Sequence, residues 1–262
     1  MVLFMKKIHV NFLEPPQEKL NSLLEHYQAG RYEDAEKLSL SITQEFPEHQ
    51  FGWKVLGAAL KQMGKINESL VASQKSVQLE PQDAEAHNNL GVMLQELRKL
   101  DDAGASYRKA ITLKPDLAEA HSNLGVILKE QGRLKEAETS YRKAIALKPD
   151  LTEAHYNLGN TLQELGRLDD AEASYRKAIT LKPDYAEAHY NLGSTLQELG
   201  RLEEAEEIFK KAINLKTGFR NAIIGLGKVL MLKGQHKEGL THIRQGNGAI
   251  FFDFDNEIWV LI

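Results

Sequence analysis

Residues 150–183 decide the fold, and their sequence is DLTEAHYNLGNTLQELGRLDDAEASYRKAITLKP. Apolar or small side chains recur at the spacing of one helical face, first at Ala154, Leu158, Gly159 and Leu162 and then at Ala171, Tyr175, Ala178 and Ile179. Gly166 lies between the two sets, where the exit of a helix needs backbone freedom, and Pro183 stops the second. The stretch therefore predicts two helices, about 152–165 and 168–181.

The start of each such helix pair also has a recurring pattern. Asp150 is followed three residues later by Glu153, which is the spacing of a capping box. The same spacing recurs at Asp116 with Glu119 and at Asp184 with Glu187. We therefore expect these aspartates to cap the first helix of each pair.

The same pattern recurs along most of the chain with a fixed period. Prolines mark it at intervals of 34 residues, at Pro47, Pro81, Pro115, Pro149 and Pro183. The run His-x-Asn-Leu-Gly begins at His87, His121, His155 and His189, and an Ala-x3-aromatic series begins at Ala103, Ala137, Ala171 and Ala205. A period in the range of about 20–50 residues indicates a repeat architecture, in which neighbouring helix pairs bury the apolar face that one pair leaves open.

These positions resemble the tetratricopeptide repeat (TPR) family. Trp53, Leu56 and Gly57 supply the Trp-x2-Leu-Gly signature, and the alanine, aromatic and proline positions follow it in register. The resemblance covers about residues 16–246, as six clear repeats and a degenerate seventh. It implies an all-α fold, a right-handed superhelical solenoid of antiparallel helix pairs.

The two ends depart from the repeat. Residues 1–15 are expected to form an N-terminal extension. In the tail, 247–262, two β-rich runs flank Asp255 and Asn256, which predicts a hairpin that covers the open end of the last helix pair. An interaction element or the stub of a larger protein is the alternative for this tail.

Composition excludes several classes of function. The chain of 262 residues has 37 acidic and 33 basic side chains, a formal charge of −4, so it lacks the positive excess of a basic nucleic-acid binder. It has no run of about 18 apolar residues, as a membrane helix requires, and its first five residues are too short for the apolar core of a secretory signal. We expect a cytoplasmic protein, although the lack of cysteine does not itself fix the compartment.

The sequence shows no convincing catalytic or metal site. The repeated histidines His87, His121, His155 and His189 lie on successive repeats, and packed helices are about 8–10 Å apart, too far for ligands of one zinc ion. We expect each imidazole to fill the position that Trp53 has in the second repeat. Asp253-x-Asp255 occurs without a nucleotide-binding fold around it, and no Gly-rich phosphate loop is present. We expect no enzyme activity, no cofactor and no metal.

The candidate site is a surface. The family resemblance implies that the first helix of each repeat lines a concave groove in which extended peptides bind. The residue before each repeated leucine is an asparagine, and together Asn89, Asn123, Asn157 and Asn191 form what we call the asparagine row. Such a row resembles the superhelical TPR arm of O-linked N-acetylglucosamine transferases, where amides hold a substrate backbone. An amide offers a donor and an acceptor to any peptide unit. The alternative is that these amides only tie neighbouring helices together.

Further groove candidates lie beside the asparagine row and one or two turns on. They are Tyr156, Tyr190, Asn160, Ser194, Gln163, Gln197, Glu164 and Glu198, with Val92, Val126, Gln95, Glu96, Lys129 and Glu130 at the related positions. These side chains predict a polar, acidic and mildly aromatic groove. We therefore expect a protein or peptide ligand that is extended and neutral to basic, and neither nucleic acid nor membrane.

Some family members hold an acidic C-terminal peptide in a clamp of lysines and asparagines. Lys54 and Asn89 match two positions of such a clamp, but Ala58, Glu119 and Asn123 replace the others, which argues against that ligand. The sequence thus favours a non-catalytic scaffold. The alternatives are a substrate-recruiting arm for a transferase encoded elsewhere and a structural protein that self-associates through its ends or tail.

Overall fold

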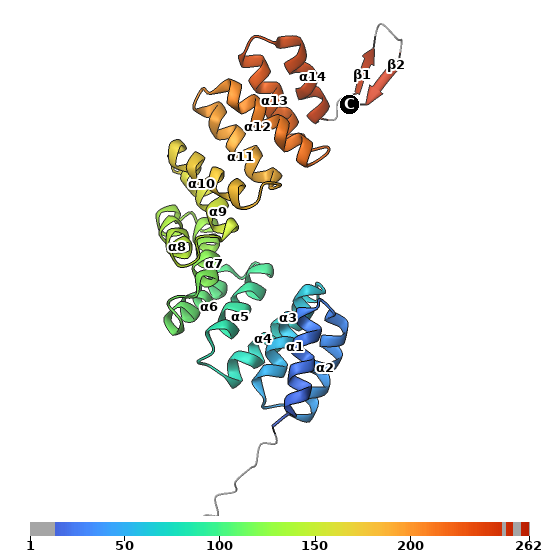
Figure 1. Cartoon of the computed structure of the whole chain (residues 1–262), viewed down its shortest axis with the longest axis vertical. Helices are drawn as coiled ribbons and strands as arrows, with labels where there is room; N and C mark the ends of the chain where they lie inside the picture. The colour runs from blue at the N-terminus through green and yellow to red at the C-terminus, as the bar shows by residue number, and fades with distance from the viewer. Residues whose placement is uncertain (1–13, 248–249, 254–257, 262) are drawn as a thin grey trace, which may run out of the picture. The chain divides into compact units, whose positions relative to one another are not determined.

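The computed structural model describes residues 14–247, 250–253 and 258–261. These residues form fourteen α-helices in chain order (Figure 1). The helices are α1 (Gln17–Gln28), α2 (Tyr32–Glu45), α3 (Gln50–Gln62), α4 (Ile66–Leu79), α5 (Ala84–Glu96), α6 (Leu100–Leu113), α7 (Ala118–Glu130), α8 (Leu134–Leu147), α9 (Thr152–Glu164), α10 (Leu168–Leu181), α11 (Ala186–Glu198), α12 (Leu202–Leu215), α13 (Arg220–Leu232) and α14 (His236–Asn247). Two short strands, β1 (Ile250–Asp253) and β2 (Ile258–Leu261), pair antiparallel with Ile250 opposite Leu261.

The chain divides into two compact units between Ile127 and Leu128, within α7. In the N-terminal unit each of α1 to α4 packs on the helix that follows it, as α5 does on α6, and α3 also contacts α1 and α5. In the C-terminal unit the same order holds from α8 to α14, and α11 also contacts α9 and α13. Every odd-numbered helix in these sets therefore lies beside the next odd-numbered helix, which positions the candidate site.

The helix pair predicted from residues 150–183 is confirmed. The structure has α9 from Thr152 to Glu164 and α10 from Leu168 to Leu181, within one residue of the expected bounds. Gly166 between them has a φ of 72°, a left-handed conformation that favours glycine. The backbone freedom inferred for this position is therefore used at the helix exit.

In three of the repeats the paired helices pack with a glycine against an aromatic ring. Tyr175 is fully buried, and a Cβ atom placed on Gly159 would lie 2.6 Å from its Cε1 atom. Gly91 meets Tyr107 in the same way, and Gly193 meets Phe209. The missing side chain lets the two helices of a pair approach closely enough to bury the ring between them.

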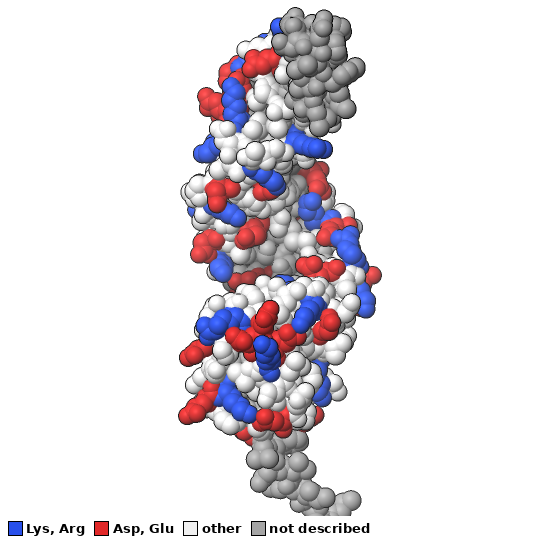
Figure 2. Space-filling view, turned by 90° about the vertical axis from the view of Figure 1, so that its right-hand side faces the viewer, with Lys and Arg blue, Asp and Glu red and all other residues white. Residues whose placement is uncertain are grey.

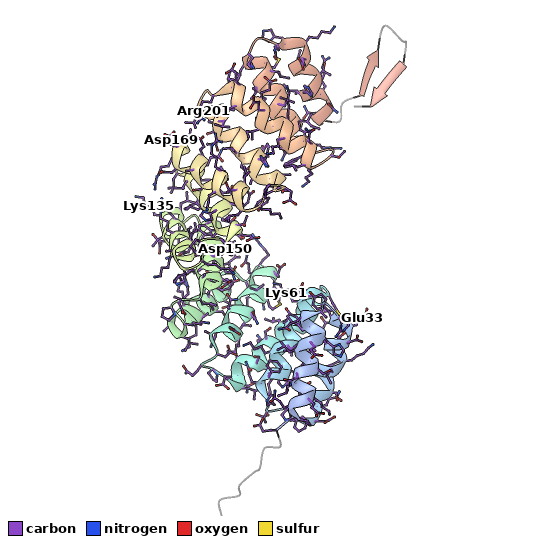
Figure 3. All side chains as sticks on the ribbon, in the orientation of Figure 1. Glu33, Lys61, Lys135, Asp150, Asp169 and Arg201 are labelled. Carbon is purple, nitrogen blue, oxygen red and sulfur yellow. The ribbon has the colours of Figure 1, made fainter. Side chains whose placement is uncertain are left out.

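The predicted capping boxes of α9 and α11 are wrong. The residues at the N-caps are Leu151 and Tyr185, and neither helix start has a side-chain cap. Asp150, labelled in Figure 3, lies in the turn one residue before the N-cap, too early to reach the first free amides. A true aspartate cap occurs on α5, where Asp83 accepts from the backbone N–H groups of residues 85 and 86.

Ion pairs link successive repeats in the C-terminal unit. Arg201, labelled in Figure 3, lies 2.6 Å from Glu172 of the preceding repeat and 2.7 Å from Glu204 of its own. Arg167 makes the equivalent contacts with Glu138 and Asp170. Figure 2 shows acidic and basic side chains interspersed over the visible face. Because the arginine side chains remain exposed to solvent, each pair contributes little, about 0–1 kcal/mol.

Candidate functional site

In the C-terminal unit a hydrogen-bond network joins α9, α10 and α11. Asn191 donates through Nδ2 to the Tyr156 hydroxyl at 3.1 Å and to Oδ1 of Asn160 at 2.7 Å. The Tyr175 hydroxyl lies 2.8 Å from the same Asn160 oxygen and 3.0 Å from Oε1 of Gln163. Burial raises the pKa of Tyr175 well above its usual value, so the phenol stays a neutral donor. Four predicted groove residues are therefore brought together in one fixed cluster.

The asparagine row divides into two kinds of residue. Asn123 donates to Asn88 at 3.1 Å and so ties α7 to α5, just as Asn191 ties α11 to α9. The side chains of Asn89 and Asn157 form no hydrogen bond with any residue in the described part of the chain, and both are half-buried. Two members of the row therefore hold neighbouring helices together, and two keep both their donors and their acceptor available.

A cavity of about 400 Å³ lies between α11 and α13. Four predicted groove residues line it, namely Tyr190, Ser194, Gln197 and Glu198. The structure adds four that the sequence analysis missed, which are Asn221, Ile224, Gly225 and Lys228. Gly225 stands 34 residues after Asn191, and a Cβ atom there would lie 2.6 Å from the Phe209 ring. The row therefore ends at a glycine because the aromatic ring beneath it leaves no space.

A smaller cavity, about 100 Å³, lies beside α3 and α5 in the N-terminal unit. Asn89 and Val92 from the predicted set line it, together with Tyr27, Ala58 and Lys61. Lys61 is labelled in Figure 3 near the end of α3. Tyr27 and Lys61 stand at the repeat position of the predicted groove residues Gln95, Gln163 and Gln197, so extending the 34-residue period to the first two repeats would have found them.

The charges near these residues are mixed. Lys129 pairs with Glu164 at 2.7 Å, and Gln163 donates to Glu198 at 2.8 Å. Lys228 lies in the same cavity lining as Glu198. Glu164 is therefore neutralised by a cation, and Glu198 accepts a hydrogen bond.

Lys54, one element of the clamp considered above, is also occupied. It pairs with Asp83 at 2.9 Å and with Glu85 at 2.7 Å. Two carboxylates already neutralise this ammonium group, and a ligand carboxylate would have to displace them. The geometry agrees with the argument from sequence against an acidic-peptide clamp.

Ring contacts hold the two predicted groove tyrosines in place. The centroid of Tyr156 lies 4.8 Å from that of Tyr185, and the centroid of Tyr190 lies 5.4 Å from that of Phe219. Burial, followed by the field of Tyr156, raises the pKa of Tyr185 to about 12. Side chains held in this way lose little conformational freedom when a ligand binds.

The repeated histidines are structural, as predicted. Nε2 of His155 donates to the carbonyl oxygen of Pro149 at 3.0 Å, and His87, His121 and His189 make the same contact with the proline six residues earlier. Trp53 donates to the Pro47 carbonyl in the same manner at 2.8 Å. Among the described residues there is no group of three side chains that could hold a metal ion.

The α-helices in the described ranges are 12 to 14 residues long. No helix there is long and apolar enough to cross a bilayer.

Comparison with known proteins identifies the repeats and the fold. The TPR repeat profile matches residues 96–132, 127–166 and 159–200, and the tetratricopeptide repeat profile matches residues 186–218. The crystal structure of MamA is 27% identical in sequence, with a TM-score of 0.56 over 62% of this chain and 94% of that chain. No curated protein matches the sequence.

Two further structures share the fold at lower identity. YrrB, described as a TPR protein with an unusual peptide-binding site, is 23% identical, with a TM-score of 0.58 over 71% of this chain and 95% of that chain. PilW, described as a type IV pilus biogenesis factor, is 20% identical, with a TM-score of 0.71 over 82% of this chain and 97% of that chain. At these identities the likeness concerns the fold alone.

Proposed function

The chain belongs to the tetratricopeptide repeat family, and from this premise we propose that it is a non-catalytic scaffold for protein–protein interaction. Its ligand is an extended polypeptide that lies along the odd-numbered helices, over the asparagine row. The right-handed superhelix and the covering role of residues 247–262 remain predictions from the sequence. The division into an extension, a repeat array and a tail also stays a prediction.

One observation carries this proposal: free carboxamides stand beside a fixed polar cluster. Asn157 on α9 has no side-chain hydrogen bond within the described residues. On the same helix, Tyr156 and Asn160 both accept hydrogen bonds from Asn191 of α11. A half-buried amide that lacks partners gains most when a peptide N–H and C=O group reach it. Each such hydrogen bond contributes about 0.5–1.5 kcal/mol, so several in a row give useful affinity.

The adjoining cavity supports the same ligand class. Tyr190, Ser194 and Gln197 offer one ring face and two neutral polar groups within about 400 Å³, enough for a side chain of the ligand. Glu198 and Lys228 both lie in the lining, so the cavity accepts polar side chains of either sign. The mixed charge of the lining therefore favours a ligand with little net charge over a basic ligand.

The experiment that tests this proposal uses short linear peptides selected from a display library on the full chain. We compare their affinity for wild type, for Asn157→Ala and for Asn157→Ala with Asn191→Ala. Asn157→Ala removes no hydrogen bond of the described structure, so folding is expected to be unaffected. We expect this single change to weaken binding by about tenfold, the equivalent of one good hydrogen bond.

The matched control is Asn214→Ala, the same substitution at an exposed position of the even-numbered helix α12. Binding to this variant should equal binding to wild type. Equal affinity for wild type and for the correctly folded double variant would contradict the groove role.

Two alternatives predict different results. A substrate-recruiting arm would co-purify with a transferase, and its selected peptides would resemble that enzyme's substrates. A self-assembling protein would change mass in light scattering when truncated after Gly246. Equal monomer masses for the full and truncated chains would remove the second alternative.

A further inference from the structure

The N-terminal unit has a second hollow, on a different side of α3 from the cavity that contains Asn89. It measures about 290 Å³ and lies between α2, α3 and α4. Its lining is mostly apolar, with Trp53, Leu56 and Leu60 from α3, Leu40 from α2 and Val71 from α4. It shares no lining residue with the cavity at Asn89. Ligands could therefore occupy the two sites independently.

Two residues of this hollow are exposed apolar side chains. Leu40 is 41% exposed and Val71 is 62% exposed, and both face solvent from neighbouring even-numbered helices. A single exposed leucine or valine is ordinary on a protein surface, but several around one hollow indicate an interaction site.

The other repeats avoid apolar bulk at these positions. At intervals of 34 residues, the position of Leu40 is occupied by Gln74, Arg108, Arg142, Arg176, Lys210 and Arg244. The position of Val71 is occupied by Lys37, Ala105, Thr139, Ala173, Glu207 and Thr241. Leucine at the first position and valine at the second therefore each occur once in the chain. The repeat fold does not require them, because five or more repeats fold with polar or small residues there.

The equivalent hollow in the C-terminal unit shows what the fold supplies without these residues. It measures about 370 Å³ and lies between α8, α9 and α10. There Arg142 stands at the position of Leu40, His155 at that of Trp53 and Ala173 at that of Val71. Ile145, Ala146 and Leu158 also line this hollow, so the packing of three helices supplies the hollow and an apolar floor. The exposed aliphatic side chains of Leu40 and Val71 are what the N-terminal unit adds.

The rim of the apolar hollow carries two carboxylates. Glu36 is paired with Lys65 at 2.7 Å. Glu68 is exposed and makes no ion pair or hydrogen bond with the described residues. An unpaired carboxylate beside an apolar hollow favours a ligand that carries a positive charge next to its apolar group.

We propose that this hollow docks a partner polypeptide through one aliphatic or aromatic side chain with a lysine or arginine next to it. The apolar side chain enters between Leu40 and Val71 against Trp53, and the cation pairs with Glu68. The site acts in addition to the asparagine row and uses the even-numbered helices. A partner could therefore be held at both sites, or two partners could bind at once.

The experiment uses a display library of short linear peptides and the full chain. Peptides that bind the double variant Leu40→Arg with Val71→Thr are first removed from the library. The remaining peptides are then selected for binding to the wild-type chain. Both substitutions install residues that other repeats carry at the same positions, Arg142 and Thr139, so the variant is expected to fold. We expect the remaining peptides to carry an apolar residue beside lysine or arginine. They should bind wild type about tenfold or more tightly than the variant.

Two further variants separate the parts of this proposal. Glu68→Gln should weaken the same peptides and reduce the dependence of their affinity on salt. Asn157→Ala with Asn191→Ala should leave their affinity unchanged, which distinguishes this site from the asparagine row. Fluorescence of Trp53, measured in a Trp259→Phe background because the chain has two tryptophans, should respond to binding.

Several results would overturn the proposal. One is that no peptides are enriched after binders to the variant are removed. Another is that the enriched peptides lack a basic residue, or bind Glu68→Gln as tightly as they bind wild type. A change of mass on Leu40→Arg in light scattering would identify a second copy of this chain as the occupant instead. A Trp53 fluorescence change on deletion of residues 1–13 alone would identify the chain's own N-terminal segment.

Discussion

At the residue scale, the contact between a glycine and an aromatic ring sets the distance between paired helices. Tyr175 is fully buried, and its hydroxyl is engaged with Asn160 and Gln163, so the ring has little room to move. Gly159 lies against that ring, with space for no Cβ atom. The glycine is therefore required by packing and not by backbone conformation.

Gly159→Ala is expected to destabilise the protein by about 1–3 kcal/mol, because the new methyl group would overlap the Tyr175 ring. The matched control is Gly104→Ala on α6. There the nearest atoms to a new Cβ are 3.3 Å away on the flexible Arg108 side chain and 3.4 Å away on Ile127. We expect the control to be neutral or to stabilise by up to about 1 kcal/mol, since alanine favours the helix. Urea unfolding measures both, and equal effects would contradict the packing argument.

His189 predicts a dependence of stability on pH. Burial, with a smaller effect of Lys211, lowers the pKa of His189, although its hydrogen bond to Pro183 acts in the opposite direction. The unfolded chain therefore binds a proton more readily than the folded one. The stabilisation is present above the ordinary histidine pKa of about 6.5 and is lost as pH falls below it, with a slope of at most about 1.4 kcal/mol per pH unit.

His189→Gln removes this titrating group. The variant should show a smaller slope of unfolding free energy between about pH 6.5 and 5, a window above the range in which carboxylates titrate. Denaturant titrations at a series of pH values measure the slope. An unchanged slope would show that His189 does not contribute to it.

At the element scale, helix ends distinguish the third repeat from the others. Where Gly64, Gly132, Gly166 and Gly200 end their helices with positive φ, the third repeat has Arg98 with a φ of 59°. Residues other than glycine adopt this conformation at a cost of about 1–2 kcal/mol. The end of α5 is therefore under a backbone strain that the equivalent helices do not have.

Arg98→Gly is expected to raise the free energy of unfolding by about 1 kcal/mol, because glycine adopts positive φ freely. The control is the reverse change at an equivalent position, Gly166→Arg, which should destabilise by a similar amount. A Cβ atom on Gly166 would meet no neighbour within 4 Å, so this control tests backbone conformation alone. Thermal unfolding of both variants checks the pair; destabilisation by Arg98→Gly would show that the arginine side chain outweighs the strain.

At the scale of the whole molecule, the repeat pattern was enough to predict most of the fold. A single helix pair determines its own bounds through local periodicity, Gly166 and Pro183, so α9 and α10 were placed within one residue. The caps of α9 and α11 were not predicted correctly. Asp83 stands one residue later in its repeat than Asp150 does, and only the later position lets the carboxylate reach the free amides. A capping pattern recognised by spacing alone does not resolve such a shift.

The candidate site could be predicted only in part. The sequence placed the asparagine row on one helix face, but it did not show which amides would be used inside the protein. That depends on contacts between repeats, such as Asn123 with Asn88 and Asn191 with Tyr156. The lining of the cavity at α13 was missed because the last repeat has Gly225 and Lys228 where the preceding repeat has Asn191 and Ser194.

The central claim is that free amides on the odd-numbered helices bind a polypeptide backbone. NMR of the side-chain amide groups tests it most directly, with a library-selected peptide added to the labelled full chain. The account predicts that the side-chain NH₂ signals of Asn89 and Asn157 shift on binding, while the signal of Asn214 on α12 stays unchanged. Shifts confined to the even-numbered helices, with the asparagine row unaffected, would contradict it.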